Sequence, residues 1–206
     1  MNKSKGEGIM LKSTSLFNTI VLSNSQLQEK RHLVSTFAVI GGSIFIGLMS
    51  QLAVVLPFSP VPVTGQTFAI LLLAITMGFR KSTLAVLTFL AQGLCGLPVF
   101  ANGASGPLYF AGPTGGYLIG FLLASAVVGF MADKNYSKTY LGAFLSMIAG
   151  SLIIYLCGFS WLSVFLGAEK AFTAGILPFI AGDLIKIMLI SISLPLSWKL
   201  YKKLSL

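Results

Sequence analysis

The 206-residue chain is 55% hydrophobic and only 9% charged, with a mean hydropathy of +0.90. Soluble domains carry roughly 25% charged residues, so this chain cannot cover a water-facing surface and must be covered largely by lipid. Its net charge of +9 comes from short basic clusters between apolar stretches, a pattern typical of loops that set membrane orientation rather than of nucleic-acid binding. The composition predicts an all-α integral membrane protein built as one helical bundle, with no nucleic-acid partner.

Residues 1–31 are polar, rich in Ser, Asn and Lys, and contain no apolar run of the signal-peptide type. We interpret them as a cytoplasmic leader, with a short helix at the membrane interface as one possible element. Residues 32–206 are then the transmembrane domain, and its first span serves as the insertion signal.

Six apolar segments are predicted to cross the membrane, because a crossing helix needs roughly 20 apolar residues and fewer where protein flanks it. Their approximate limits are 33–56, 66–79, 82–97, 117–131, 139–159 and 176–201. The second and third are short. Three prolines, Pro57, Pro60 and Pro62, exclude an ordinary helix between the first two spans.

The basic residues fix the expected orientation. Of the 14 Lys and Arg residues, all except Lys170 and Lys186 fall on one side of the six spans, which leaves 14 − 2 = 12 on that side. The positive-inside rule therefore predicts both termini in the cytoplasm, which requires an even number of spans.

The connections predicted outside, residues 57–65, 98–116 and 160–175, are long or rich in Pro and Gly, whereas the inner connections are short and basic. Irregular, nearly uncharged backbone such as residues 100–109 is costly against lipid. We expect it to fold over the bundle as a lid or to line a cavity, so the binding machinery should face outward.

Asp183 and Lys186 in the last span are expected at membrane depth, and their i, i+3 spacing places them on one helical face. Ionisable residues at that depth are functional candidates, with Asp183 accepting ligand N–H groups and Lys186 neutralising a ligand carboxylate. The alternative is a structural ion pair that stabilises helix packing.

Thr64, Gln66 and Thr67 offer neutral donors and acceptors where the chain re-enters the membrane. They are candidate ligand contacts, and N-capping by Thr64 is the alternative. Tyr117 follows the segment GPTGG and can stack and donate a hydrogen bond, although this segment is also compatible with a plain loop-to-helix turn. Asn102, an amide in an otherwise apolar loop, is a further candidate contact.

Small residues recur at helical spacing in the first span: Ala38 with Gly42, and Ser43 with Gly47. Such a stripe lets another helix approach closely, either from this chain or from another subunit. The cysteines, Cys95 and Cys157, lie in apolar segments without metal-binding companions and are interpreted as packing residues.

No phosphate-binding loop, HExxH motif or GxSxG elbow occurs in the chain. No constellation supports catalysis, so the chain is not expected to be an enzyme or to carry a metal or cofactor.

Four segments, PVPVTGQTF, GLPVFANG, GPTGGYLIGF and PFIAGDLIK, occur in an order and spacing that resemble the BioY family. Members of that family are the biotin-binding S-components of energy-coupling-factor (ECF) vitamin transporters. The resemblance covers about residues 33–200. It implies a six-helix S-component bundle in the plasma membrane, with an outward-facing pocket that captures biotin.

The resemblance further implies partnership with a transmembrane T-component and two ABC-type ATPases. It carries ligand contact over to Asp183 and Lys186 in the GDxxK stretch, with Asn102, Tyr117, Gln66 and Thr64 as the remaining candidates in the pocket. Which end of biotin meets each charge stays open at this point.

Two departures from the family pattern stand out. Gly65 occupies a position where the family more often has Leu, and the AxxxA-type contact to the T-component is replaced here by the small residues of the first span. A free-standing secondary transporter, with Asp183 coupling to protons, is the alternative function, although the chain shows no inverted repeat.

Overall fold

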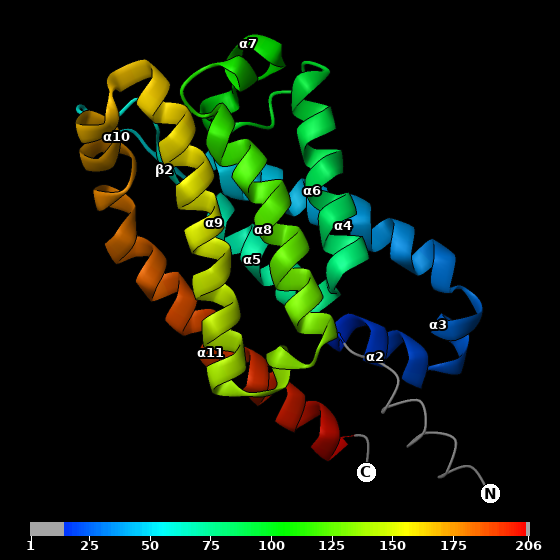
Figure 1. Cartoon of the computed structure of the whole chain (residues 1–206). Helices are drawn as coiled ribbons and strands as arrows, with labels where there is room; N and C mark the ends of the chain where they lie inside the picture. The colour runs from blue at the N-terminus through cyan, green and yellow to red at the C-terminus, as the bar shows by residue number, and fades with distance from the viewer. Residues whose placement is uncertain (1–14, 205–206) are drawn as a thin grey trace, which may run out of the picture.

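The computed structural model describes residues 15–204, and these are almost entirely helical (Figure 1). The α-helices are α2 (Leu16–Ser23), α3 (Ser25–Glu29), α4 (Arg31–Gln51), α5 (Gln66–Met77), α6 (Phe79–Leu94), α7 (Gly106–Ala111), α8 (Gly115–Asp133), α9 (Tyr140–Leu166), α10 (Ala168–Gly175) and α11 (Leu177–Leu204). Two 3₁₀ turns, η1 (Ala101–Gly103) and η2 (Tyr136–Lys138), and two short strands, β1 (Ala53–Val54) and β2 (Val63–Thr64), complete the described part.

Four helical stretches are long and apolar enough to cross a membrane: Arg31–Gln51, Gly115–Asp133, Tyr140–Leu166 and Ala168–Tyr201, the last joining α10 to α11. The other two helices of the bundle are shorter, with 12 residues in α5 and 16 in α6. At 1.5 Å per residue they reach only about 18 and 24 Å. The all-α membrane class is confirmed, with four candidate spans.

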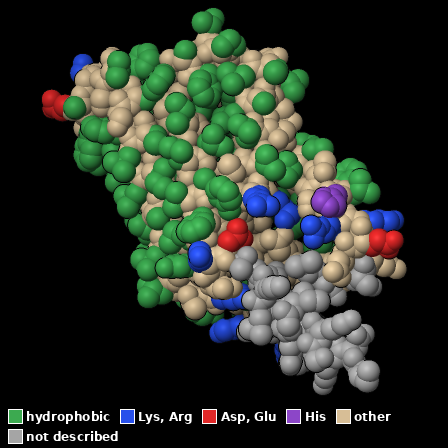
Figure 2. All heavy atoms as spheres, turned by 45° about the vertical axis from the view of Figure 1, so that its right-hand side comes forward, with side chains coloured by type: hydrophobic (Ala, Val, Ile, Leu, Met, Phe, Trp, Pro, Cys, Tyr) green, Lys and Arg blue, Asp and Glu red, His purple; other side chains and the backbone are tan. Residues whose placement is uncertain are grey.

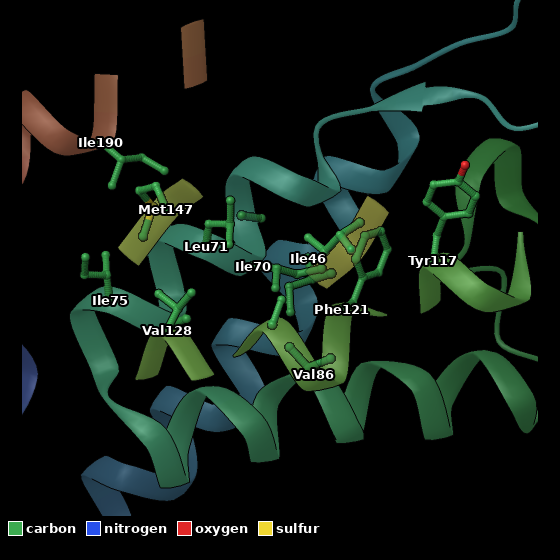
Figure 3. Packing of buried hydrophobic residues seen from close by; sticks show 14 of the residues in the cluster. Ile46, Ile70, Leu71, Ile75, Val86, Tyr117, Phe121, Val128, Met147 and Ile190 are labelled. Carbon is green, nitrogen blue, oxygen red and sulfur yellow. The ribbon is translucent and has the colours of Figure 1, made fainter. Parts of the chain in front are cut away.

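The core forms where α4, α5, α6, α8, α9 and α11 each contribute a buried face. Figure 3 shows part of it, with Ile46, Ile70 and Phe121 meeting from α4, α5 and α8. The short helix α5 lies inside the bundle and buries eight of its residues. Outside this core, large apolar side chains stay exposed, for example Phe37 and Leu48 on α4. An apolar exterior around an apolar core is what a lipid environment requires.

Glycines set the close approach of α8 and α9. A Cβ on Gly116 would lie 2.2 Å from Trp161 Cβ, and one on Gly120 would lie 3.0 Å from Ile154 Cα. Because lipid competes for apolar contacts, membrane helices associate mainly through such tight van der Waals packing. These two glycines thereby allow α8 and α9 to pack in direct contact.

Several predicted boundaries shift. The first helix ends at Gln51 rather than Leu56, because Ala53 and Val54 pair antiparallel with Thr64 and Val63 and close a hairpin around the prolines. The pair Arg80–Lys81, expected in an inner loop, lies in the first turn of α6.

The predicted outer connection 160–175 is also mostly helical. Its first part extends α9 to Leu166, and α10 follows after Gly167, which has a φ of 80°. The sequence missed this because α10 is amphipathic and short, whereas span prediction depends on apolar length.

The division into a leader and a transmembrane domain stays a prediction, and residues 1–14 of the leader lie outside the described residues. The remainder folds as α2 and α3, with Ser15 and Thr19 buried against the bundle. The Ser15 hydroxyl donates to the carbonyl of Met77, 3.3 Å away, and so attaches α2 to the end of α5.

Charged side chains are segregated along the bundle. On the face drawn in Figure 2, apolar side chains cover the body of the molecule and Lys and Arg side chains gather towards one end. Figure 1 shows α2 and the end of α11 at that end, and α7 and α10 at the opposite end.

Candidate functional site

A pocket opens at the end of the bundle that carries the β-hairpin, α7 and α10. It contains about 480 Å³ of empty space, part of which is open to the exterior. Its lining combines apolar and aromatic side chains with a few hydroxyls and one amide: Val61, Pro62, Thr64, Gln66, Thr67, Ala101, Tyr109, Thr114, Tyr117, Leu118, Phe121, Ile154, Tyr155 and Phe179. Seven elements contribute (β2, α5, η1, α7, α8, α9 and α11), so the pocket exists only in the assembled bundle.

The hairpin delivers Thr64 and Gln66 to the pocket wall. The Thr64 hydroxyl donates to Gln66 Oε1 at 3.1 Å and accepts the backbone N–H of Gln66 at 3.3 Å. Thr64 thus lines the pocket, but it is not the N-cap that was considered as the alternative, because Gly65 caps α5 without a side-chain bond. Its ligand contact stays a prediction. Gln66 is 5% exposed and its Nε2 has no hydrogen-bond partner, which leaves an unsatisfied donor in the wall.

Tyr117 lines the pocket with its ring and donates its hydroxyl hydrogen to the carbonyl of Gly175, 2.7 Å away. The ring stacks with Phe179 at 6.1 Å between centroids. A Cβ on Gly158 would lie 2.3 Å from Tyr117 Cε1, so only glycine lets the ring lie against α9. Tyr117 thus joins α8 to α10 as well as forming wall.

Asp183 and Lys186 form an ion pair, with Nζ 2.9 Å from Oδ1. Asp183 is 4% exposed and also accepts the hydroxyl hydrogens of Thr67 at 3.0 Å and Tyr155 at 2.6 Å. Lys186 donates further to the Thr64 carbonyl at 3.0 Å and to Thr67 Oγ1 at 2.8 Å.

An ammonium group has three N–H donors, and these contacts use all three of Lys186. Both charged residues therefore sit behind the lining, shielded by Thr64, Thr67 and Tyr155. This is the geometry of the structural ion pair that the sequence left as the alternative, and direct ligand contact stays a prediction.

Asn102 lies on η1 with an exposed side chain and a left-handed backbone, φ 57°. Its neighbour Ala101 is buried and lines the pocket, whereas Asn102 lies outside the lining. The structure does not bring this amide to the other candidates, and its ligand contact also stays a prediction.

The pocket contains residues that the sequence interpretation did not single out, chiefly Tyr155, Tyr109, Phe121 and Phe179. Tyr155 carried a usable signal, because a tyrosine within an apolar span needs a hydrogen-bond partner. Tyr109 stacks on Phe100 at 5.3 Å, and burial raises the pKa of its phenol above the ordinary value, so it is neutral at physiological pH.

Side chains from the bundle hold the connections over the pocket. Gln51 donates to the Phe100 carbonyl and accepts from the Gly103 N–H, both at 3.0 Å. Trp161 Nε1 donates to the Gly112 carbonyl at 2.9 Å. These bonds attach the two ends of the segment η1–α7, which supplies Ala101 and Tyr109 to the lining.

The small-residue stripe of α4 faces this chain's own helices. A Cβ on Gly42 would lie 3.1 Å from Ala85 Cβ, Ser43 accepts from Gln92 Nε2 at 3.4 Å, and Gly47 faces Val99. Ala38, nearer the start of the helix, is half-buried. This corresponds to the intramolecular alternative, and subunit contact at the stripe stays a prediction.

Both cysteines are free thiols. Cys157 packs close to Gly120, where an added Cβ would lie 3.2 Å from Cys157 Cβ, whereas Cys95 is exposed at the end of α6.

Comparison with known proteins identifies the family. The BioY family profile matches residues 23–203. The chain is 34% identical over 179 residues to the probable biotin transporter BioY of Rickettsia prowazekii, covering 86% of this chain and 91% of that protein. It is 41% identical over 148 residues to the biotin transporter BioY of Thermotoga maritima, covering 69% and 86%.

The fold is also that of a solved protein. A crystal structure of the S-component for biotin from an ECF-type ABC transporter superposes with a TM-score of 0.75 at 27% identity, over 82% of this chain and 93% of that one. The resemblance in the four sequence segments is thereby confirmed, and the chain belongs to the BioY family.

Proposed function

We propose that this chain is the substrate-binding membrane subunit of a biotin uptake transporter, which captures biotin from outside and delivers it inward with an ATP-driven energy-coupling module. The observation that carries the proposal is the pocket of about 480 Å³ at the end of the bundle away from the basic clusters. Relatives that match over most of their length are named as biotin transporters.

The chemistry of the lining fits biotin. Small-molecule pockets are mostly apolar with a few placed polar groups. Here Phe121, Ile154 and Phe179 offer apolar surface for a bicyclic ring and an aliphatic tail. Gln66, Thr64 and Tyr155 offer hydrogen-bonding groups for the ureido ring, which has two N–H donors and one carbonyl.

Gln66 is the best-supported polar contact among the proposed site residues. Its Nε2 donor is buried without a partner, and leaving such a group unpaired costs roughly 1–3 kcal/mol. A ligand oxygen, either the ureido carbonyl or the carboxylate, would remove that cost. Asn102 would have to move, and Lys186 would have to exchange a hydrogen bond, before either could touch the ligand. We therefore propose that these two contacts form only when the η1–α7 segment closes over bound ligand.

We further propose that six helices cross the plasma membrane, with α5 and α6 as the short second and third spans, and that both termini are cytoplasmic. Arg31 begins α4, Arg80 lies in the first turn of α6, Lys134 directly follows α8 and Lys199 lies in the last turns of α11. Figure 1 shows the end of α11 opposite α7 and α10, the end at which the pocket opens. The positive-inside rule then directs the pocket outward.

The expected partners are a transmembrane T-component and two ABC-type ATPases. The solved structure that this fold resembles is described as an S-component from an ECF-type ABC transporter. The present chain carries no phosphate-binding loop, so the energy of ATP would come from partners. Release of biotin inward then requires a second bundle state, favoured by those partners.

Calorimetric binding of biotin to the purified chain in detergent tests the proposal directly, with biotin methyl ester and desthiobiotin as comparators. Tight binding of biotin is expected, and weaker binding of the ester would indicate a cation or donor at the carboxylate. Absence of binding to well-folded protein would contradict the proposal.

Uptake into vesicles separates this function from a free-standing secondary transporter. We expect radiolabelled biotin to accumulate only when the T-component and ATPases are reconstituted with the chain and ATP is supplied. Accumulation by the chain alone, driven by a proton or ion gradient, would favour the alternative.

A further inference from the structure

Tyr155 connects the pocket to the buried ion pair. The side chain lines the pocket from α9, and its hydroxyl lies 2.6 Å from Asp183 Oδ2. Asp183 does not line the pocket and is 4% exposed. Whatever the carboxylate does for a ligand in this conformation, it does through the residues that cover it.

The donor and acceptor inventory of these groups is restrictive. A tyrosine hydroxyl has one hydrogen, and Tyr155 directs it at Asp183. A carboxylate cannot donate, so the hydrogen of this bond comes from Tyr155, while the other carboxylate oxygen, Oδ1, pairs with Lys186. Any hydrogen bond between Tyr155 and a ligand is therefore one that Oη accepts.

The other hydroxyls near the pair are engaged differently. Thr67 donates to Asp183 and also accepts from Lys186, so both of its roles are filled inside the network. Tyr117 donates to the Gly175 carbonyl, a neutral partner. Of these three, Tyr155 alone combines a place in the lining with donation to a charged acceptor and no second hydrogen bond to the described residues. Donation to a carboxylate strengthens an oxygen as an acceptor.

We propose that Tyr155, oriented by Asp183, is the residue through which the pocket selects an N–H donor on its ligand. The inference rests on the proposed function, under which that donor is one of the two ureido N–H groups of biotin. Asp183 is then a positioning residue in this step, and Lys186 balances its charge.

The test compares biotin with two analogues, each methylated on one ureido nitrogen, in calorimetric titrations of the purified full chain. The measured quantity is the discrimination ratio, the affinity for biotin divided by that for the weaker analogue. In the wild-type protein the ratio includes the lost hydrogen bond and any steric cost of the methyl group. In Tyr155→Phe we expect the ratio to fall by about fivefold, since the hydrogen bond from the ligand N–H to Oη is no longer available to lose.

Tyr117→Phe is the matched control, because it removes a hydroxyl from the same pocket that donates to a neutral carbonyl. It is expected to leave the ratio unchanged even where it lowers affinity for every ligand. Asp183→Asn is expected to lower the ratio in the same direction as Tyr155→Phe, because the tyrosine hydrogen is then no longer held by a charge.

An unchanged ratio in Tyr155→Phe would overturn the inference, and an unchanged ratio in Asp183→Asn alone would overturn the positioning role. If the folded wild-type protein did not bind biotin, the proposed function would fail, and this inference with it. Failure of the proposed function would appear as lost binding in the wild-type protein, whereas failure of this inference alone would appear only in the variants.

Discussion

The two ends of the bundle differ in how the backbone groups of their connecting segments are hydrogen-bonded. At the basic end, successive helices are joined by short turns with bonds of their own, to which Ser15 and Asp133 add bonds to Met77 and Phe79. Gly78 alone separates α5 from α6, and its N–H bonds to the Ala74 carbonyl at 3.1 Å. At the pocket end, side chains from distant elements bond the connecting backbone, as Ser59 does to the Ala174 carbonyl at 2.8 Å and Tyr117 to that of Gly175.

The difference has a physical consequence. Buried backbone groups must be paired, and in a membrane water cannot replace a missing partner. A local turn pairs them within itself and changes only if the turn unfolds. A side chain that reaches across the bundle can exchange one acceptor for another. We therefore expect the pocket end to be the end that rearranges around a ligand.

The largest expected effect comes from breaking the ion pair behind the pocket. Asp183→Asn and Lys186→Ala should each weaken biotin binding by about 2–5 kcal/mol, because the remaining charge or its partners are left unpaired at low exposure. Calorimetry against Lys170→Ala, an exposed cation on α10, provides the comparison. Wild-type affinity in both pair variants would exclude this face of α11 from the site.

A second pair of variants replaces one glycine by alanine at the pocket end and one at the basic end. Gly158→Ala drives a Cβ to 2.3 Å from the Tyr117 ring, and Gly129→Ala drives one to 2.7 Å from the Phe79 backbone. Overpacking costs roughly 1–3 kcal/mol.

We expect Gly158→Ala to lower biotin affinity more than thermal stability, because the ring can move into the pocket. Gly129→Ala should lower thermal stability, since backbone must give way, while the folded protein still binds. Equal effects of the two variants on binding would contradict the contrast between the ends.

Trp161→Phe tests whether bonds to the connections retain the ligand. Phenylalanine keeps an aromatic ring at this position, although a smaller one, and removes the 2.9 Å hydrogen bond to the Gly112 carbonyl. A single neutral bond is worth about 1 kcal/mol, so biotin should dissociate several-fold faster. Stopped-flow displacement measures this rate, and an unchanged rate would show that the bond from Trp161 to Gly112 does not help to retain the ligand.

The smallest effect is expected at the basic end. Asp133 Oδ2 accepts the N–H of Phe79 at 3.0 Å, at the start of α6. Asp133→Asn keeps an acceptor but removes a charge from a helix N-terminus, worth about 0.3–1 kcal/mol. The melting temperature should fall slightly with biotin affinity unchanged, and a large loss of affinity would show that the two ends are coupled.

Much of the fold was predictable because apolar length and proline position act locally. The limits of α5 and α8 follow those expected for 66–79 and 117–131 to within two residues at each end. The errors fall where tertiary pairing competes with apolar length, as at Ala53–Val54, an apolar pair that forms a strand instead of continuing α4. The membership of Thr64, Gln66 and Tyr117 in the pocket was also predicted, whereas that of Tyr155 was not.

The sequence by itself determined the membrane class, the segregation of charge, the family and the shared helical face of Asp183 and Lys186, since composition and i, i+3 spacing need no knowledge of other helices. Only the tertiary structure decided which groups face the pocket. It placed Tyr155 and Thr67 in front of the ion pair and left Asn102 outside, because which side of a helix or turn lines a cavity depends on where its neighbours pack.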